Sequence, residues 1–181
     1  MKAYLGHILW SIYVSPLWLI WAAMAVLVVF WGIAGLLGTR KFPKVWRGIN
    51  IFCCICSVAA ILYVTIVDRS TKDRFLQLIP FHFIIEAQEH IEILRSMLMN
   101  AFLFVPLGLS LPFAVNKKTT QTIKITLVAA LFFSVCIEIV QYIFGFGRTE
   151  TDDVLCNLFG TFIGMLSYWA VSVFNSKKRK K

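Results

Sequence analysis

The chain has 181 residues, of which 59% are hydrophobic and 15% are charged, and its formal net charge is +9. A soluble domain of this size is nearer half apolar and a quarter charged, and its core could not hide the excess apolar residues. The composition therefore excludes an ordinary soluble globular domain. Strong positive charge is typical of nucleic-acid-binding proteins, but here it is confined to short segments between apolar runs, so no nucleic-acid partner is expected.

Five apolar runs are long enough to cross a bilayer, which takes roughly 20 residues of helix. In chain order these predicted spans are Leu17–Leu37, Ile49–Val67, Met97–Val115, Ile125–Phe144 and Val154–Phe174. Each run is apolar on all sides, whereas a spanning strand would alternate between apolar and polar residues. The sequence predicts an all-α membrane protein in which residues 1–181 form a single bundle of about five transmembrane helices.

Charge in the connections between the spans predicts their orientation. Twelve basic residues occur in residues 38–48, 116–124 and 175–181, and these three segments contain no acid. The other two connections, residues 68–95 and 145–153, contain five and three acids. Positively charged segments remain on the cytoplasmic side of a membrane. The N-terminus is therefore predicted outside and the C-terminus inside, with membrane lipids as the surroundings of the bundle.

The long outer connection, residues 68–95, ends in an amphipathic segment. From Ile84 onward, apolar residues recur at helical spacing with acids between them, which predicts a helix on the outer membrane surface or over the bundle. His82, Glu86 and His90 are spaced four apart and could line one helix face as metal ligands. A solvated face is the favoured interpretation, and we predict no metal and no cofactor.

Two spans contain residues that affect helix geometry and packing. Pro106, in the third span, removes a helix hydrogen bond and is expected to bend the helix. Gly160 and Gly164, in the fifth span, form a small-residue face that lets two helices approach closely. Packing within the bundle is favoured for this face, and a homodimer through the two glycines is the alternative.

Glu138 is the most informative residue, because a carboxylate within a span costs roughly 2.5–3.5 kcal/mol on insertion scales and needs a partner or a function. The predicted topology places it in the outer half of the fourth span, and Arg148, in the short loop above, is its expected charge partner. We predict one outward-facing polar pocket for a head group or small polar ligand, with a purely structural polar network as the alternative. The residues predicted to converge there are Arg95, Asn100, Glu138, Gln141, Arg148, Asp152, Asp153 and Asn157.

Four segments occur in an order that resembles the VanZ-like family of bacterial membrane proteins. They are LIPF (Leu78–Phe81), NAFLFVPLG (Asn100–Gly108), IEIVQ (Ile137–Gln141) and RTETDDVLCNLFGTFIG (Arg148–Gly164). The first two spans match this family only in hydropathy. Members often have a further acid shortly before the paired aspartates, where this chain has Glu150 and Thr151.

The resemblance implies a role in the cell envelope and a location in the bacterial cytoplasmic membrane. Founding members of the family are associated with low-level resistance to teicoplanin, a lipid-bearing glycopeptide antibiotic. The expected function is to bind or shield an envelope component, either a lipid-linked cell-wall precursor or the lipoglycopeptide itself. The alternative is an enzyme that acts on a lipid-linked substrate with Glu138 or Asp153 as acid/base. Against it, the predicted pocket contains no nucleophile–base pair and no histidine.

Overall fold

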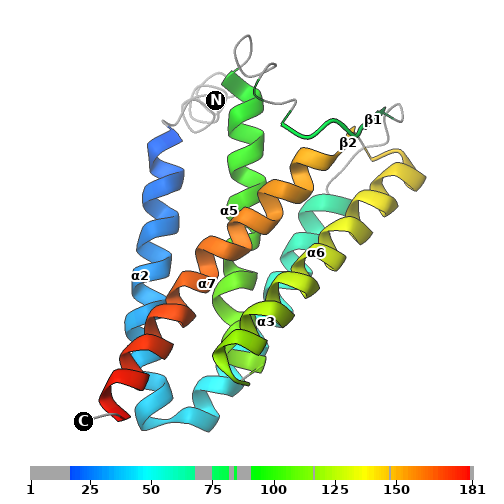
Figure 1. Ribbon diagram of the computed structural model, residues 1–181. Coiled ribbons are helices and arrows are strands. Elements are labelled where there is room, and N and C mark those ends of the chain that lie inside the picture. The colour runs from blue at the N-terminus through cyan, green and yellow to red at the C-terminus, as the bar shows by residue number, and fades with distance from the viewer. Residues whose placement is uncertain are drawn as a thin grey trace, which may run out of the picture.

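The computed structural model describes residues 17–67, 75–81, 84, 91–115, 117–146 and 148–179. In this part of the chain five helices are long and apolar enough to cross a membrane. They are α2 (Leu17–Lys41), α3 (Pro43–Leu62), α5 (Ile91–Val115), α6 (Thr119–Phe144) and α7 (Thr151–Arg179), arranged as a bundle (Figure 1). The predicted all-α bundle of five transmembrane helices is confirmed.

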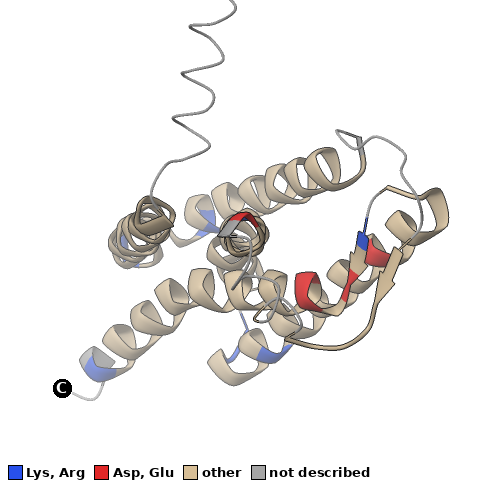
Figure 2. Ribbon diagram, turned by 90° about the horizontal axis from the view of Figure 1, so that it is seen from above, with Lys and Arg blue, Asp and Glu red and all other residues tan. Residues whose placement is uncertain are grey.

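The bundle has two chemically different ends. α2, α5 and α7 run from one end to the other, and α3 and α6 return (Figure 1). One end, here called the strand end, has the short strands β1 (Phe75–Gln77) and β2 (Arg148–Glu150), and the described acidic residues lie on this side (Figure 2). The opposite end, here called the basic end, has the α2–α3 and α5–α6 connections and the end of α7, with their lysines and arginines.

Each helix is longer than the apolar run that predicted it, because polar and charged turns continue the helical hydrogen bonding beyond the apolar residues. α5 shows this most clearly, since it begins at Ile91 and not near Met97. The last turn of the predicted amphipathic segment, including Arg95, therefore belongs to a spanning helix. Residues 82–83 and 85–90, with His82, Glu86 and His90, lie outside the described residues.

α5 and α7 cross at very close range in the middle of the bundle. A Cβ added to Gly160 of α7 would overlap the carbonyl oxygen of Ala101, and one added to Gly164 would overlap that of Val105. From the other side, a Cβ on Gly108 of α5 would overlap the carbonyl oxygen of Thr161. Small residues let helix backbones approach in this way. The glycine face is thus occupied within the chain, and a second copy could use it only by displacing α5.

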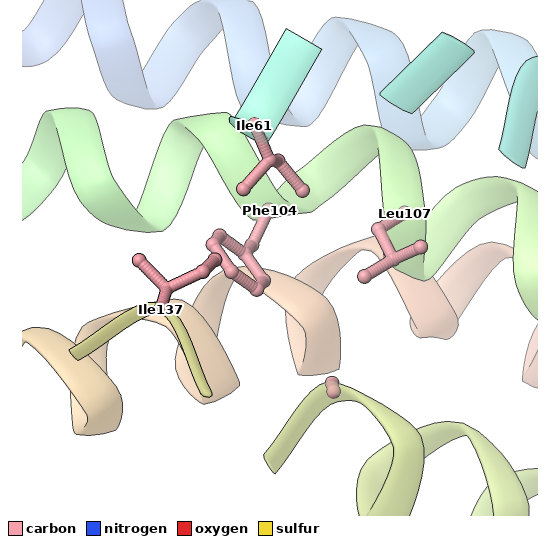
Figure 3. Close-up of a cluster of buried hydrophobic side chains, with 5 residues drawn as sticks. Ile61, Phe104, Leu107 and Ile137 are labelled. Atoms are coloured by element: carbon pink, nitrogen blue, oxygen red, sulfur yellow. The ribbon is translucent and has the colours of Figure 1, made fainter. Parts of the chain in front are cut away.

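α5 is the most buried of the spans and organises the core. Phe104 and Leu107 of α5 pack with Ile61 of α3 and with Ala130 and Ile137 of α6 (Figure 3). On its other side, Val105 and Leu109 of α5 pack against Met24 of α2. Large apolar side chains such as those of Phe52, Phe132 and Trp169 are exposed on the outer faces of the helices. Such a surface is suited to contact with lipid tails.

Two local features position groups at the strand end. α3 continues as a π-helical turn, η1 (Tyr63–Val67), whose altered hydrogen bonding leaves carbonyl groups available to other side chains. α6 ends at Phe144 and is capped by Gly145, whose φ of 68° is the left-handed conformation that glycine adopts without steric cost. The Phe146 N–H donates to the Gln141 carbonyl (2.9 Å), and β2 begins at Arg148.

Candidate functional site at the strand end

Two short parallel strands cover the ends of α6 and α7. β1 and β2 pair in the register Phe75 with Arg148, Leu76 with Thr149 and Gln77 with Glu150. Parallel pairing joins segments that are far apart in the sequence, because β1 follows the second span and β2 follows the fourth. The strands therefore fix the connection before α7 over the Glu138 region of α6.

Glu138 is 7% exposed, and its carboxylate is bound by the backbone of β2. Its Oε2 accepts a hydrogen bond from the Glu150 N–H at 3.1 Å. A backbone donor stabilises the charged form of a carboxylate and offsets part of the cost of burying it. The strand pairing that positions Glu150 thus also stabilises the acid on α6.

Arg148 forms an ion pair through its Nε with Oε1 of Glu150, two residues along the same strand. Its guanidinium also lies over the Phe75 ring, 4.9 Å from the ring centroid, in a cation–π contact. The arginine is thus held on the outer side of the two strands, with Glu150 as a charge partner. An Arg148–Glu138 pair stays a prediction.

Asp152 is almost completely buried in the first turn of α7. Its Oδ1 accepts a hydrogen bond from the Phe81 N–H at 2.6 Å. Phe81 has a φ of 62°, an uncommon conformation for a bulky residue, and this contact helps to hold it. The neighbouring Thr151 hydroxyl donates to the Leu78 carbonyl at 3.3 Å. The start of α7 is therefore tied to the segment that follows β1.

The other predicted site residues are distributed over several contacts. Gln141 is buried, and its Nε2 donates to the Thr65 carbonyl of η1 at 2.9 Å. Deeper in the bundle, the buried Asn157 donates through Nδ2 to the Ser134 hydroxyl at 2.8 Å. Three further residues are half-buried at the same end: Arg95 and Asn100 on α5, and Asp153 in the first turn of α7.

A cavity of about 270 Å³ lies between α6, the two strands and the start of α7. Glu138 lines it, while the other seven predicted residues do not. Its walls are mainly apolar side chains of α6, of β1 and the residue after it, and of α7, and its polar side chains are those of Glu138, Tyr142 and residues 149–151. The full lining is Leu76, Leu78, Val135, Glu138, Ile139, Tyr142, Thr149, Glu150, Thr151 and Val154.

Thr149 is one of four polar lining residues outside the predicted set, with Tyr142, Glu150 and Thr151. It is 8% exposed, and its hydroxyl has no hydrogen-bond partner among the described residues. Its neighbours in the sequence are charged, so no periodic pattern marks it, and only the pairing of β1 with β2 turns it inward. The cavity thus has the Glu138 carboxylate within mainly apolar walls, with the buried Thr149 hydroxyl beside it, which suits an amphipathic ligand.

Among the described residues, no three His, Cys, Asp or Glu side chains are grouped so that they could hold a metal ion. The lining side chains with polar groups are Glu138 and Tyr142 of α6, and Thr149, Glu150 and Thr151 of β2 and the start of α7. These groups can form hydrogen bonds with a ligand.

Comparison with known proteins addresses the resemblance seen in the sequence. The family model described as VanZ/LLP1 matches residues 48–174. The chain belongs to the VanZ/LLP1 family. The match includes both strands, the cavity and the α5–α7 crossing, and begins within α3.

A named relative within this family is Protein VanZ of Enterococcus faecium. The two sequences are 39% identical over 74 residues, which is 41% of this chain and 44% of that protein. The match thus covers less than half of the relative's length. No solved structure matches the chain. Sequence similarity therefore shows the family, and the structure gives the geometry of this chain's strand end.

Proposed function

We propose that this VanZ/LLP1 family member lowers the sensitivity of a bacterial cell to lipoglycopeptide antibiotics such as teicoplanin. It does so by binding an amphipathic envelope component in the strand-end cavity. The observation that carries the proposal is Glu138 in the wall of a mainly apolar cavity at the end of a membrane bundle, next to the buried Thr149 hydroxyl, which has no partner among the described residues. Family membership supports the biological setting.

The geometry favours a ligand with a polar head group and a lipid chain. Glu138 accepts hydrogen bonds from hydroxyl, amide or amine groups, and the Thr149 hydroxyl donates to an oxygen acceptor. Ile139 and Tyr142 are exposed on the outer face of α6 and also line the cavity, so the site is continuous with the lipid-facing surface. A lipid-linked cell-wall precursor and a lipoglycopeptide both combine sugar or peptide groups with an acyl or prenyl chain.

We further infer that the strand end faces outward from the bacterial cytoplasmic membrane. The basic end has a set of lysines and arginines without an acid in the same connections, as the positive-inside rule requires of cytoplasmic segments. Reporter fusions test this orientation. Fusions after Lys118 and at the C-terminus should report a cytoplasmic location, and a fusion after Gln88 an external one. An external C-terminus would place the cavity in the inner leaflet and end the proposal.

The enzymatic alternative gains less support from the geometry. The enzyme expected as the alternative uses Glu138 or Asp153 as acid/base, and only a carboxylate that lines the cavity can act on a molecule bound there. Glu138 lines the cavity and Asp153 does not. Binding is therefore the function that this arrangement supports best.

Tolerance to teicoplanin in a sensitive bacterial host tests the binding site directly. Glu138→Ala should return tolerance to the level of the host alone, because a lost hydrogen bond to a charged group costs about 1.5–3 kcal/mol, or roughly 10–150-fold in affinity. Glu138→Gln should keep part of the function through its amide. Glu92→Gln, which neutralises an exposed acid at the same end, is the matched control and should behave as wild type.

Membrane levels must be equal by immunoblot for these variants. Full tolerance with Glu138→Ala at equal abundance would show that the cavity is not the functional site. If Glu138→Gln and Asp153→Asn both abolish tolerance while remaining folded, acid–base chemistry replaces binding as the mechanism. Thr149→Val, which replaces the hydroxyl with a methyl group, should lower tolerance less than Glu138→Ala.

A further inference from the structure

The basic end contains a second cavity, of about 210 Å³, among the ends of four helices. Its walls include Thr39 of α2, Trp46 and Arg47 of α3, Phe113 of α5, and Tyr168 and Asn175 of α7. One water molecule occupies roughly 30 Å³ in the liquid, so a single bound water would not fill this space. The cavity shares no residue with the strand-end site, and what it binds is a separate question.

The charge around this second cavity is positive. Arg47 donates through Nε to the Ala114 carbonyl at 3.0 Å, and Arg40 donates through Nε to Oδ1 of Asn175 at 2.9 Å. Both acceptors are neutral, so these contacts orient the guanidinium groups without cancelling their charge. The sequence has no acid in residues 17–67, 93–137 or 154–181, which supply all the helix ends here. The site therefore favours an anion.

A buried donor without a partner also occurs in the wall of this cavity. The indole Nε1 of Trp46 has no hydrogen-bond partner among the described residues. The neighbouring Trp31 shows the usual arrangement, because its Nε1 donates to Oδ1 of Asn50 at 3.1 Å. Buried N–H groups are normally satisfied, and one that is not indicates a missing acceptor. An oxygen-rich anion supplies acceptors.

The walls also fit the position of the cavity at a membrane surface. Phe113 contacts Trp46 and Tyr168 edge to face, with ring centroids 5.6 Å and 5.1 Å apart. Trp and Tyr are enriched where lipid head groups meet the hydrocarbon core. Basic pockets between transmembrane helices bind phosphate-bearing lipid head groups, and arginine matches phosphate geometry well.

We propose that the cavity at the basic end binds a phosphoryl group, with Arg47 as the charged contact and the Trp46 indole as a neutral donor. The phosphoryl group comes from an anionic phospholipid of the adjoining leaflet or from free phosphate. Nothing in this proposal depends on the function proposed for the strand end, and the two stand or fall separately.

Native mass spectrometry of the full chain in a phosphate-free, non-ionic detergent tests the lipid source. Phosphatidylglycerol and diacylglycerol with identical acyl chains are the probes. The wild type should retain phosphatidylglycerol over diacylglycerol. Arg47→Gln and Trp46→Phe should each weaken this retention, Arg47→Gln by about tenfold or more, as expected for a lost charge-assisted hydrogen bond. Lys124→Gln removes the same charge at this end, and Trp169→Phe changes an exposed tryptophan, so both controls should retain the lipid.

A titration of inorganic phosphate against the melting temperature tests the free-phosphate source. A phosphate-dependent rise that Arg47→Gln abolishes, with the two lipids retained alike, would identify free phosphate as the ligand. If neither phosphatidylglycerol nor phosphate binding depends on Arg47, the proposal is wrong. Arg47 is exposed and its substitution should leave the fold intact, so Arg47→Gln decides the outcome even if Trp46→Phe is unstable.

Discussion

The two ends of the bundle use charge in opposite ways. At the strand end, the acids Glu138 and Asp152 are buried and accept hydrogen bonds from backbone N–H groups of Glu150 and Phe81. At the basic end, Arg47 is exposed and donates to a backbone carbonyl. Burying a charge in a membrane protein is costly, whereas exposed cations at helix ends cost little and also orient the chain in the bilayer. The contrast supports the proposal that the envelope function belongs to the strand end.

The largest expected effect comes from the α5–α7 crossing, on which both ends depend. Gly160→Leu should destabilise the protein by more than about 3 kcal/mol, because the new side chain overlaps backbone and not a movable side chain. The loss is measured by thermal unfolding in detergent and by abundance in membranes. Gly48→Leu is the matched control, since Gly48 is a helical glycine with no atom within 4 Å of an added Cβ.

This variant also distinguishes the two interpretations of the glycine face. If Gly160 and Gly164 mediate a homodimer, Gly160→Leu should separate the subunits and leave a folded monomer. If they pack α7 against α5, as the structure has them, the monomer itself should be lost. Size-exclusion chromatography with light scattering tells these results apart.

A smaller loss of unfolding free energy is expected when an amide side chain is removed from either half of the molecule. Asn157→Ala removes the buried hydrogen bond to Ser134 and should cost about 1–2 kcal/mol, within the range measured for polar contacts between membrane helices. Asn175→Ala removes the contacts to Arg40 and Thr39 near the surface and should cost less than about 1 kcal/mol. Equal losses for the two variants would contradict the contrast between the ends.

Substitution of Arg148 tests which acid at the strand end is its main charge partner. Because its side chain is 46% exposed, Arg148→Ala should cost only about 1 kcal/mol in unfolding free energy. In double-mutant cycles the coupling of Arg148 to Glu150 should exceed its coupling to Glu138, since the ion pair joins Arg148 to Glu150. A larger coupling to Glu138 would support the pairing expected from the sequence.

The architecture was predictable because one physical constraint determines it. Every backbone group within the bilayer must be satisfied inside its own segment, so long apolar runs such as Ile125–Phe144 can only be helices. The short loop between the fourth and fifth spans also placed the segment with Arg148 above Glu138, and in the structure the Glu150 N–H of this segment donates to Glu138. The predicted end of the fourth span at Phe144 is also the last residue of α6.

The partners of the polar residues were not predictable. Gln141 is bound by the Thr65 carbonyl, which a π-helical turn makes available, and Asp152 by the N–H of Phe81, which has a left-handed conformation. The residue types in these two segments do not predict either backbone conformation. Two strands of three residues are likewise too short to leave a periodic pattern, so the sequence did not indicate that Thr149 is buried between its charged neighbours.

The smallest expected effect comes from deleting Lys177–Lys181. These residues lie at the end of α7 and beyond, and residues 38–48 and 116–124 have seven further basic residues that maintain the orientation. Asn175, which contacts Arg40, remains in the shortened chain. Teicoplanin tolerance at matched membrane levels should therefore stay near that of wild type, whereas Glu138→Ala should lose it. An inactive truncation together with an active Glu138→Ala would reverse the assignment of function between the two ends, because the exposed cations would then act where the buried acid does not.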